Sequence, residues 1–182
     1  MKRALGFAAL MAALPAHALA QHGEVQLGVV ASYGAPSSLR QGVGVVAGVA
    51  MGRLLYVGVR GVHHVGTTRA VAAGASGNLS NGAQVLLADI GLMIPVGPLE
   101  VVPGIALGAM RFRQRDTETT HATKFVAAAG LSIQARVAGL VVVPEVQYYA
   151  ARHPHLAYPT PHRGVVAAVR VVFPFEVRRI RY

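Results

Sequence analysis

Eight ionisable side chains occupy alternate positions in segments whose intervening residues are mostly apolar. They are Glu24, Asp89, Glu100 and Glu145 among the acids, and Arg60, Lys124, Arg136 and Arg170 among the bases. Because successive side chains of a β-strand point to opposite faces, strands would place all eight on one side of a sheet. Buried charges must be paired, so we expect an interlocked network inside a closed interior. The alternative is a charged lining of an open pore.

Histidines form a second candidate group. His153, His155 and His162 share one predicted loop, and His121 lies on a neighbouring one. Imidazoles gathered in this way can bind Zn²⁺ or Cu²⁺. Their spacing is loose and no carboxylate stands nearby, so the sequence predicts exposed loop histidines and neither a metal site nor a cofactor.

The segment 123–137, TKFVAAAGLSIQARV, shows the kind of element that would position these groups. One face is entirely apolar and includes Phe125 and Leu131, whereas the other carries Lys124, Arg136 and small residues. The same alternation recurs along the chain and indicates β-strands. It predicts eight of them, at 24–33, 41–51, 54–65, 84–94, 100–113, 123–137, 140–150 and 164–175.

The predicted connections alternate in length. Three are only two or three residues long, GR, VGP and AG, whereas the others are longer and rich in turn-forming residues. The longer ones lie at 34–41, 66–82, 113–122 and 153–163. Short turns at one end, long loops at the other and an even number of strands are typical of an outer-membrane barrel.

The composition narrows the class of protein. Only 13% of the residues are charged and the mean hydropathy is +0.47, whereas soluble domains average about 25% charged residues. Beyond residue 20, no stretch has the roughly 18 consecutive apolar residues of a membrane-spanning helix. The chain has no cysteine, which excludes disulfides, zinc–thiolate sites and thiol nucleophiles. Strands with one face toward lipid reconcile these observations.

Residues 1–20, MKRALGFAALMAALPAHALA, have the organisation of a secretory signal peptide. Lys2 and Arg3 precede an apolar run, and Ala18-Leu19-Ala20 matches an A-x-A cleavage site. The alternative is a membrane anchor, for which the run is short. We therefore expect a cleaved signal and one exported domain at 21–182.

A soluble barrel with the apolar face inward is the alternative architecture. It would leave a surface made largely of Gly42, Gly44, Gly104 and Gly108, which is far poorer in charge than soluble surfaces are. A narrow lumen, in contrast, requires small residues and a few mutually satisfied polar groups. The predicted fold class is all-β: an eight-stranded antiparallel up-and-down transmembrane β-barrel with lipid outside and a crowded polar interior.

The stretch ADIGLMIPVGPLEVVPGIALGAM, residues 88–110, resembles the central hairpin of the small outer-membrane β-barrel superfamily, which includes the OmpX, OmpW and OmpA transmembrane-domain types. In that hairpin a strand ends in a Pro/Gly turn and the next strand carries spaced glycines. Members usually end at an aromatic residue of the last strand. Here Phe173-Pro174-Phe175 is followed by EVRRIRY, so the last strand ends either near Phe175 or at Tyr182.

The resemblance also implies two enzymatic possibilities, lipid A deacylases with a His-x-Ser motif and palmitoyl transferases with an Asp-Ser pair. This sequence contains neither motif. The nearest approximation is His121 with Thr123, together with Glu118 or Glu145 as the carboxylate. We therefore expect a non-enzymatic protein.

The net charge of +10 points to anionic partners. Arginines gather near the predicted long loops, where they either attract lipopolysaccharide head groups and other polyanions or simply mark the polar rim. They are Arg40, Arg69, Arg111, Arg113, Arg115, Arg152 and Arg163. We expect a monomer of structural or surface-interaction type, inserted by the barrel-assembly machinery and without nucleic acid; the alternative is a narrow channel for small solutes.

Overall fold

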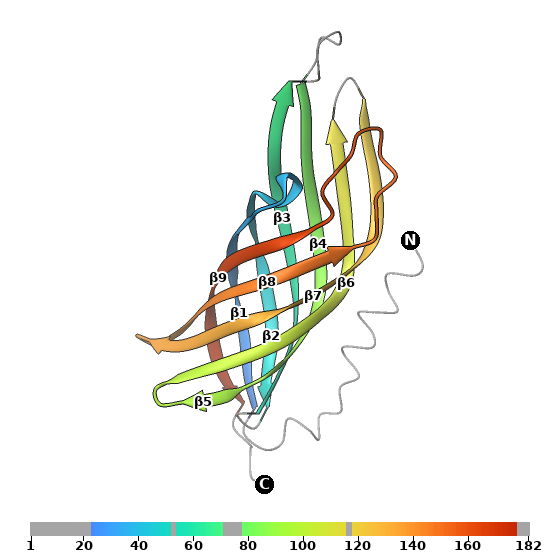
Figure 1. Cartoon of the computed structure of the whole chain (residues 1–182). Helices are drawn as coiled ribbons and strands as arrows, with labels where there is room; N and C mark the ends of the chain where they lie inside the picture. The colour runs from blue at the N-terminus through green and yellow to red at the C-terminus, as the bar shows by residue number, and fades with distance from the viewer. Residues whose placement is uncertain (1–22, 52–53, 71–77, 116–117, 178–182) are drawn as a thin grey trace.

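The computed structural model describes residues 23–51, 54–70, 78–115 and 118–177. Within them the chain forms nine β-strands and one short 3-10 helix (Figure 1). The elements are β1 (Gly23–Gly34), η2 (Ser37–Leu39), β2 (Gln41–Met51), β3 (Leu55–Ala70), β4 (Asn78–Leu92), β5 (Ile94–Val96), β6 (Leu99–Arg115), β7 (Thr119–Val137), β8 (Leu140–Ala151) and β9 (Arg163–Val177). The predicted signal peptide, residues 1–20, lies outside the described residues.

The strands close into an antiparallel barrel. Except for β4 and β5, strands that are consecutive in the chain pair with each other. In addition β1 pairs with β9 and β4 with β6, so the sheet has no open side. The short β5 continues the line of β4 beyond Met93, and the wall therefore has eight strands. This is the predicted eight-stranded antiparallel up-and-down barrel. In the described residues no helix has the length and apolarity needed to cross a membrane.

The predicted alternation sets the two faces of the wall. Outward positions carry exposed apolar side chains all around the barrel, among them Leu27, Val45, Ile105 and Phe173. The same strands turn their charged and small residues inward, and Arg60, Asp89 and Glu145 are buried there. The side of the sheet that each residue occupies thus follows from the period of two.

Two ends of the barrel can be distinguished. The turn end holds the short connections, including Gly97 and the pair Ala138-Gly139, all at positive φ. The loop end holds the longer connections and η2 (Figure 1). β1 begins and β9 ends at the turn end, where Gly23 pairs with Val177.

Several strands differ in length from the prediction. β3 and β4 extend into the segment 66–82, and β6 and β7 extend into 113–122, both predicted as loops. Backbone hydrogen bonds continue there whatever the side chains are, so polar residues do not end these strands. The predicted strand 84–94 is interrupted at Met93, whose amide donates to the Leu54 carbonyl at 2.7 Å. β9 reaches Val177, and residues 178–182 lie outside the described part of the chain.

The interior is layered, in contrast to the predicted polar lumen. An apolar cluster that includes Leu39, Leu87, Phe112 and Val126 fills the loop-end half. Two smaller apolar clusters lie toward the turn end, one around Val141 and Val172 and the other around Tyr56, Met93 and Val102. On β4, Asp89 follows Leu87 and precedes Met93, which places the buried charges between the apolar layers.

Candidate functional site

Four charged side chains meet inside the barrel. The guanidinium of Arg60 on β3 donates from Nε and Nη2 to the two carboxylate oxygens of Asp89 on β4, at 2.8 and 2.7 Å. Its Nη1 donates across the lumen to Glu145 Oε1 on β8, at 2.5 Å. Arg60 is only 3% exposed, so this fork of three hydrogen bonds operates away from bulk water.

Arg170 on β9 completes the cluster. Its Nε lies 3.1 Å from Glu145 Oε2, an ion pair without hydrogen-bond geometry. Its Nη1 donates to the Tyr56 hydroxyl at 3.3 Å, and the guanidinium carbon lies 5.4 Å from the centre of the Tyr56 ring. Two arginines thus face two carboxylates, and the buried cluster is electrically neutral.

A second ion pair lies apart from this cluster. Arg136 Nη2 donates to Glu24 Oε2 at 2.5 Å, and Gln26 donates to the other carboxylate oxygen of Glu24 at 2.8 Å. The Arg136 side chain is 60% exposed, so water screens this pair. It joins β1 to β7 near the turn end.

Glu100 and Lys124 do not join either group. Both stand at inward positions, but Glu100 lies at the turn end of β6 and Lys124 near the loop end of β7. Within the described part of the chain, neither makes an ion pair. The single interlocked network predicted from the sequence is therefore replaced by a cluster of four charges and a separate pair, because position along the barrel axis separates groups of the same parity.

The first connection at the loop end folds into the barrel mouth. Leu39, the last residue of η2, is fully buried and belongs to the apolar cluster with Phe112 and Val126. The backbone holds it there, since Gly34 N donates to Arg40 O and Leu39 N to Pro36 O, both at 2.9 Å.

The connection from β8 to β9, residues 152–162, also covers the mouth. Buried Gln114 on β6 donates to Tyr158 O at 2.7 Å and to Thr160 Oγ1 at 2.6 Å, and it accepts from Tyr158 N at 3.2 Å. The two connections also join each other, because Ser38 Oγ donates to Pro161 O at 2.9 Å. Together they form a hydrogen-bonded cap over the lumen.

Sequence reasoning identified the central charges and missed this cap. Leu39 lies in a segment with the Gly, Pro and Ser content of an exposed loop. The available signal was an isolated large apolar residue in an otherwise polar stretch. Gln114 has the inward parity of Phe112, but it was assigned to a loop because the strand was predicted to end before it.

The rim arginines fall into two groups. Arg40 Nη1 donates to the Tyr33 hydroxyl at 2.5 Å, while Arg152 and Arg163 are exposed at the loop end. Arg113 and Arg115, in contrast, are outward residues of β6, as is Arg111. Nothing is described of the Arg69 side chain.

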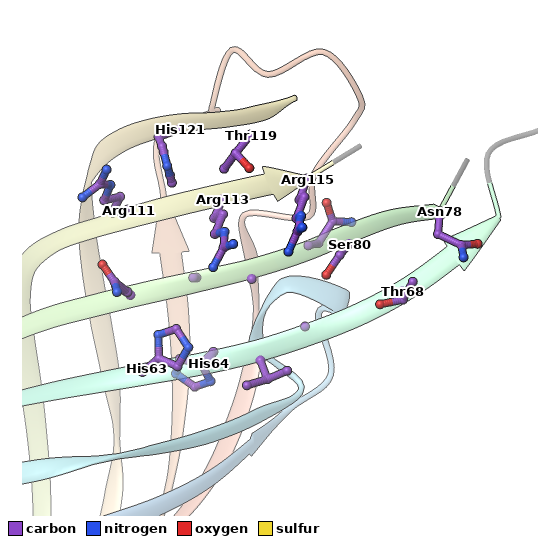
Figure 2. A pocket seen from close by; sticks show the side chains of 16 residues that line it. His63, His64, Thr68, Asn78, Ser80, Arg111, Arg113, Arg115, Thr119 and His121 are labelled. Atoms are coloured by element: carbon purple, nitrogen blue, oxygen red, sulfur yellow. The ribbon is translucent and has the colours of Figure 1, made fainter. Parts of the chain in front are cut away.

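The three β6 arginines border a hollow of about 670 Å³ on the outer wall of the barrel (Figure 2). The register sets a polar residue of at least one neighbouring strand beside each of them. Gln84 and Thr123 flank Arg111, and Gly82 and His121 flank Arg113. Ser80 and Thr119 flank Arg115 in the same way. His63 and Thr68 of β3 extend these rows, so the hollow covers four strands.

The histidines of the last loop lie together. The ring centre of His153 is 5.7 Å from that of His155 and 5.0 Å from that of His162, with edge-to-face geometry in both pairs. In the ranges that the structure describes, no three His, Asp or Glu side chains form a group able to hold a metal ion.

The possible catalytic group is divided by the barrel wall. His121 and Thr123 point outward from β7, whereas Glu145 is buried in the lumen, bonded to Arg60. Glu118 is an exposed residue before β7. Glu145 and His121 therefore cannot form the carboxylate–imidazole hydrogen bond that a catalytic triad requires.

No protein-family model and no curated protein sequence matches this chain. Among solved structures, a major outer membrane protein from Thermus thermophilus aligns with 84% of this chain and 99% of its own, at a TM-score of 0.62 and 13% identity. Ail from Yersinia pestis aligns with 86% of this chain and 98% of its own (TM-score 0.48, 9% identity). Neisserial surface protein A aligns with 86% of this chain and 97% of its own (TM-score 0.45, 13% identity). With its closed wall and apolar exterior, this chain has the fold of the small eight-stranded outer-membrane β-barrels.

Proposed function

We propose that this protein is an outer-membrane barrel of structural or surface-interaction type, non-enzymatic and with a closed lumen. The fold shared with the Thermus outer membrane protein supports the location. So do the exposed apolar side chains of the wall, such as Val43 at 66% and Leu86 at 63% exposure, which water would disfavour and lipid would accept.

The observation that carries the proposal is the filled interior. Arg60, Asp89, Glu145 and Arg170 form ion pairs with one another, and the hollow beside them measures about 20 Å³. That is room for about one water molecule. Apolar layers lie on both sides of the charges, and the cap covers the loop end. A solute that crosses the lumen would have to displace the charged cluster, the apolar layers and the cap.

In the orientation usual for outer-membrane barrels, the turn end faces the periplasm and the loop end faces the outside of the cell. Arg40, Arg152 and Arg163 then give the outer rim a positive charge. A basic surface at this position attracts anionic partners that lie beyond the lipid head groups, such as surface polyanions.

Two measurements test this proposal. Heat-modifiable migration on unboiled gels and insertion into lipid vesicles are expected; solubility without detergent would overturn the membrane location. In planar bilayers we expect no steady conductance, since the lumen is filled. Steady single-channel currents would instead establish the narrow channel.

The non-enzymatic part has its own test. Its support is the separation of His121 from Glu145 and the absence of the His-x-Ser and Asp-Ser motifs. Expression in a Gram-negative host should leave the acylation pattern of lipid A unchanged, as read by mass spectrometry. A new acylation state would overturn it.

A further inference from the structure

The outward face of β6 changes character at one position. From Leu99 to Ala109 every outward residue is apolar, a stretch of eleven residues. A tilted strand needs about 9–11 residues to cross the hydrocarbon core of a membrane. Arg111, Arg113 and Arg115 follow at the next three outward positions. They therefore begin where the acyl chains end, at the level of the lipid head groups.

These arginines have no partners within the described chain. No side-chain hydrogen bond or ion pair joins any of them to another described residue, and no carboxylate lines the hollow that they border. The Cα atoms at alternate positions are roughly 6.8 Å apart along a strand. The three arginines present an array of hydrogen-bond donors, and Arg binds phosphate oxygens through two parallel hydrogen bonds.

The hollow opens sideways, toward the membrane, and below it the wall offers an apolar surface. Leu86, Ala109 and Phe125 form the next row toward the turn end, followed by Leu107. Leu86, Phe125 and Leu107 are 63%, 53% and 49% exposed. An amphiphile with a phosphorylated head and acyl chains fits both parts at once, whereas a soluble anion would use only the upper part.

We propose that Arg111 and Arg113, with Arg115 above them, bind the phosphate groups of a phosphorylated glycolipid of the outer leaflet, whose acyl chains lie along Leu86, Leu107 and Phe125. Thr119 and His121, which line the hollow (Figure 2), add polar contacts beside the head group. Thr123 pairs with Arg111 and adds another. This inference rests on the proposed outer-membrane location and deepens it by assigning one lipid site on one side of the barrel.

The test is lipid retention, measured by native mass spectrometry on the full chain folded in detergent. The probes are diphosphorylated lipid A and the same glycolipid with its phosphates removed. The site variant is R111Q/R113Q, and R152Q/R163Q removes the same charge elsewhere at the loop end. Heat-modifiable migration of each variant verifies folding.

We expect the wild type to retain diphosphorylated lipid A, and R111Q/R113Q to bind it about tenfold or more weakly, since hydrogen bonds between charged groups are stronger than neutral ones. The R152Q/R163Q control should change binding less than about twofold, as distant surface charges are screened. Equal retention of the dephosphorylated lipid, or equal losses in both variants, would overturn the site. Either result would leave the proposed function standing if the folded chain still inserts into membranes.

Discussion

At the scale of single residues, Glu145 connects the buried charged side chains at the centre of the barrel. Its two carboxylate oxygens face different arginines, Arg60 from β3 and Arg170 from β9, so it links distant parts of the wall. Asp89 can neutralise only one of these arginines, since both of its oxygens bind Arg60. The interior charge balance therefore depends on Glu145.

We predict that Glu145→Gln lowers the free energy of unfolding by about 3–5 kcal/mol, because Arg170 then stays buried without a counter-charge. Urea unfolding in lipid vesicles measures it. Glu100→Gln is the matched control: Glu100 also faces inward but makes no described ion pair, and its change should stay within about 1 kcal/mol. Similar small losses for both variants would indicate a hydrated, channel-like lumen.

At the scale of elements, the loop end is an ordered part of the fold. The strand extensions bring Gln114 of β6 above the apolar cluster, where it binds the β8–β9 connection through Tyr158 and Thr160. η2, in the connection from β1 to β2, contributes Leu39, which packs in the same apolar cluster. The cap is thus assembled from two connections and one strand that are far apart in the sequence.

We predict that Gln114→Ala loosens the 152–162 connection and lowers stability by about 1–3 kcal/mol, because buried hydrogen bonds are lost. Limited proteolysis of the folded chain should show faster cleavage within 152–162. Gln84→Ala provides the comparison, since Gln84 is exposed on the outer face of β4, away from the cap. Equal protease resistance of Gln114→Ala and the wild type would contradict a hydrogen-bonded cap.

At the scale of the whole molecule, the barrel is organised inside out relative to a soluble domain. Its outer wall exposes many large apolar residues, and four charged residues, Arg60, Asp89, Glu145 and Arg170, are buried in the lumen. Such a molecule requires lipid or detergent around the wall. A change in the medium around the wall therefore acts most directly on this belt of outward apolar residues.

We predict that Ile105→Arg, within the apolar belt of β6, lowers the free energy of unfolding in lipid by about 2–4 kcal/mol, the cost of a charge near the bilayer midplane. Val43→Arg, close to the loop end of β2, should cost about 0–1 kcal/mol because the head-group region accepts charge. Both side chains are more than half exposed, at 57% and 66%, so neither substitution crowds the interior. Equal effects at the two depths would contradict a membrane-spanning belt.

The sequence by itself determined the class of fold and the side of the wall that each residue occupies. Alternation has a period of two, and a period is a local property that neighbouring residues establish. It assigned Arg60, Asp89 and Glu145 to the interior and Phe125 and Leu131 to the exterior, as the structure has them. Turn-forming residues and short links likewise indicated the order of the strands.

Only the tertiary structure decided which of these residues meet. Parity gives the face but not the height, and the height follows from the register of every strand pair around the closed barrel. Register brings Glu145 to Arg60 and leaves Glu100 and Lys124 at opposite ends. It also sets Arg111 beside Gln84 and Thr123 on the outer wall. The inward fold of Leu39 has a similar origin, because an apolar residue in a connection finds its partners only once the barrel mouth exists.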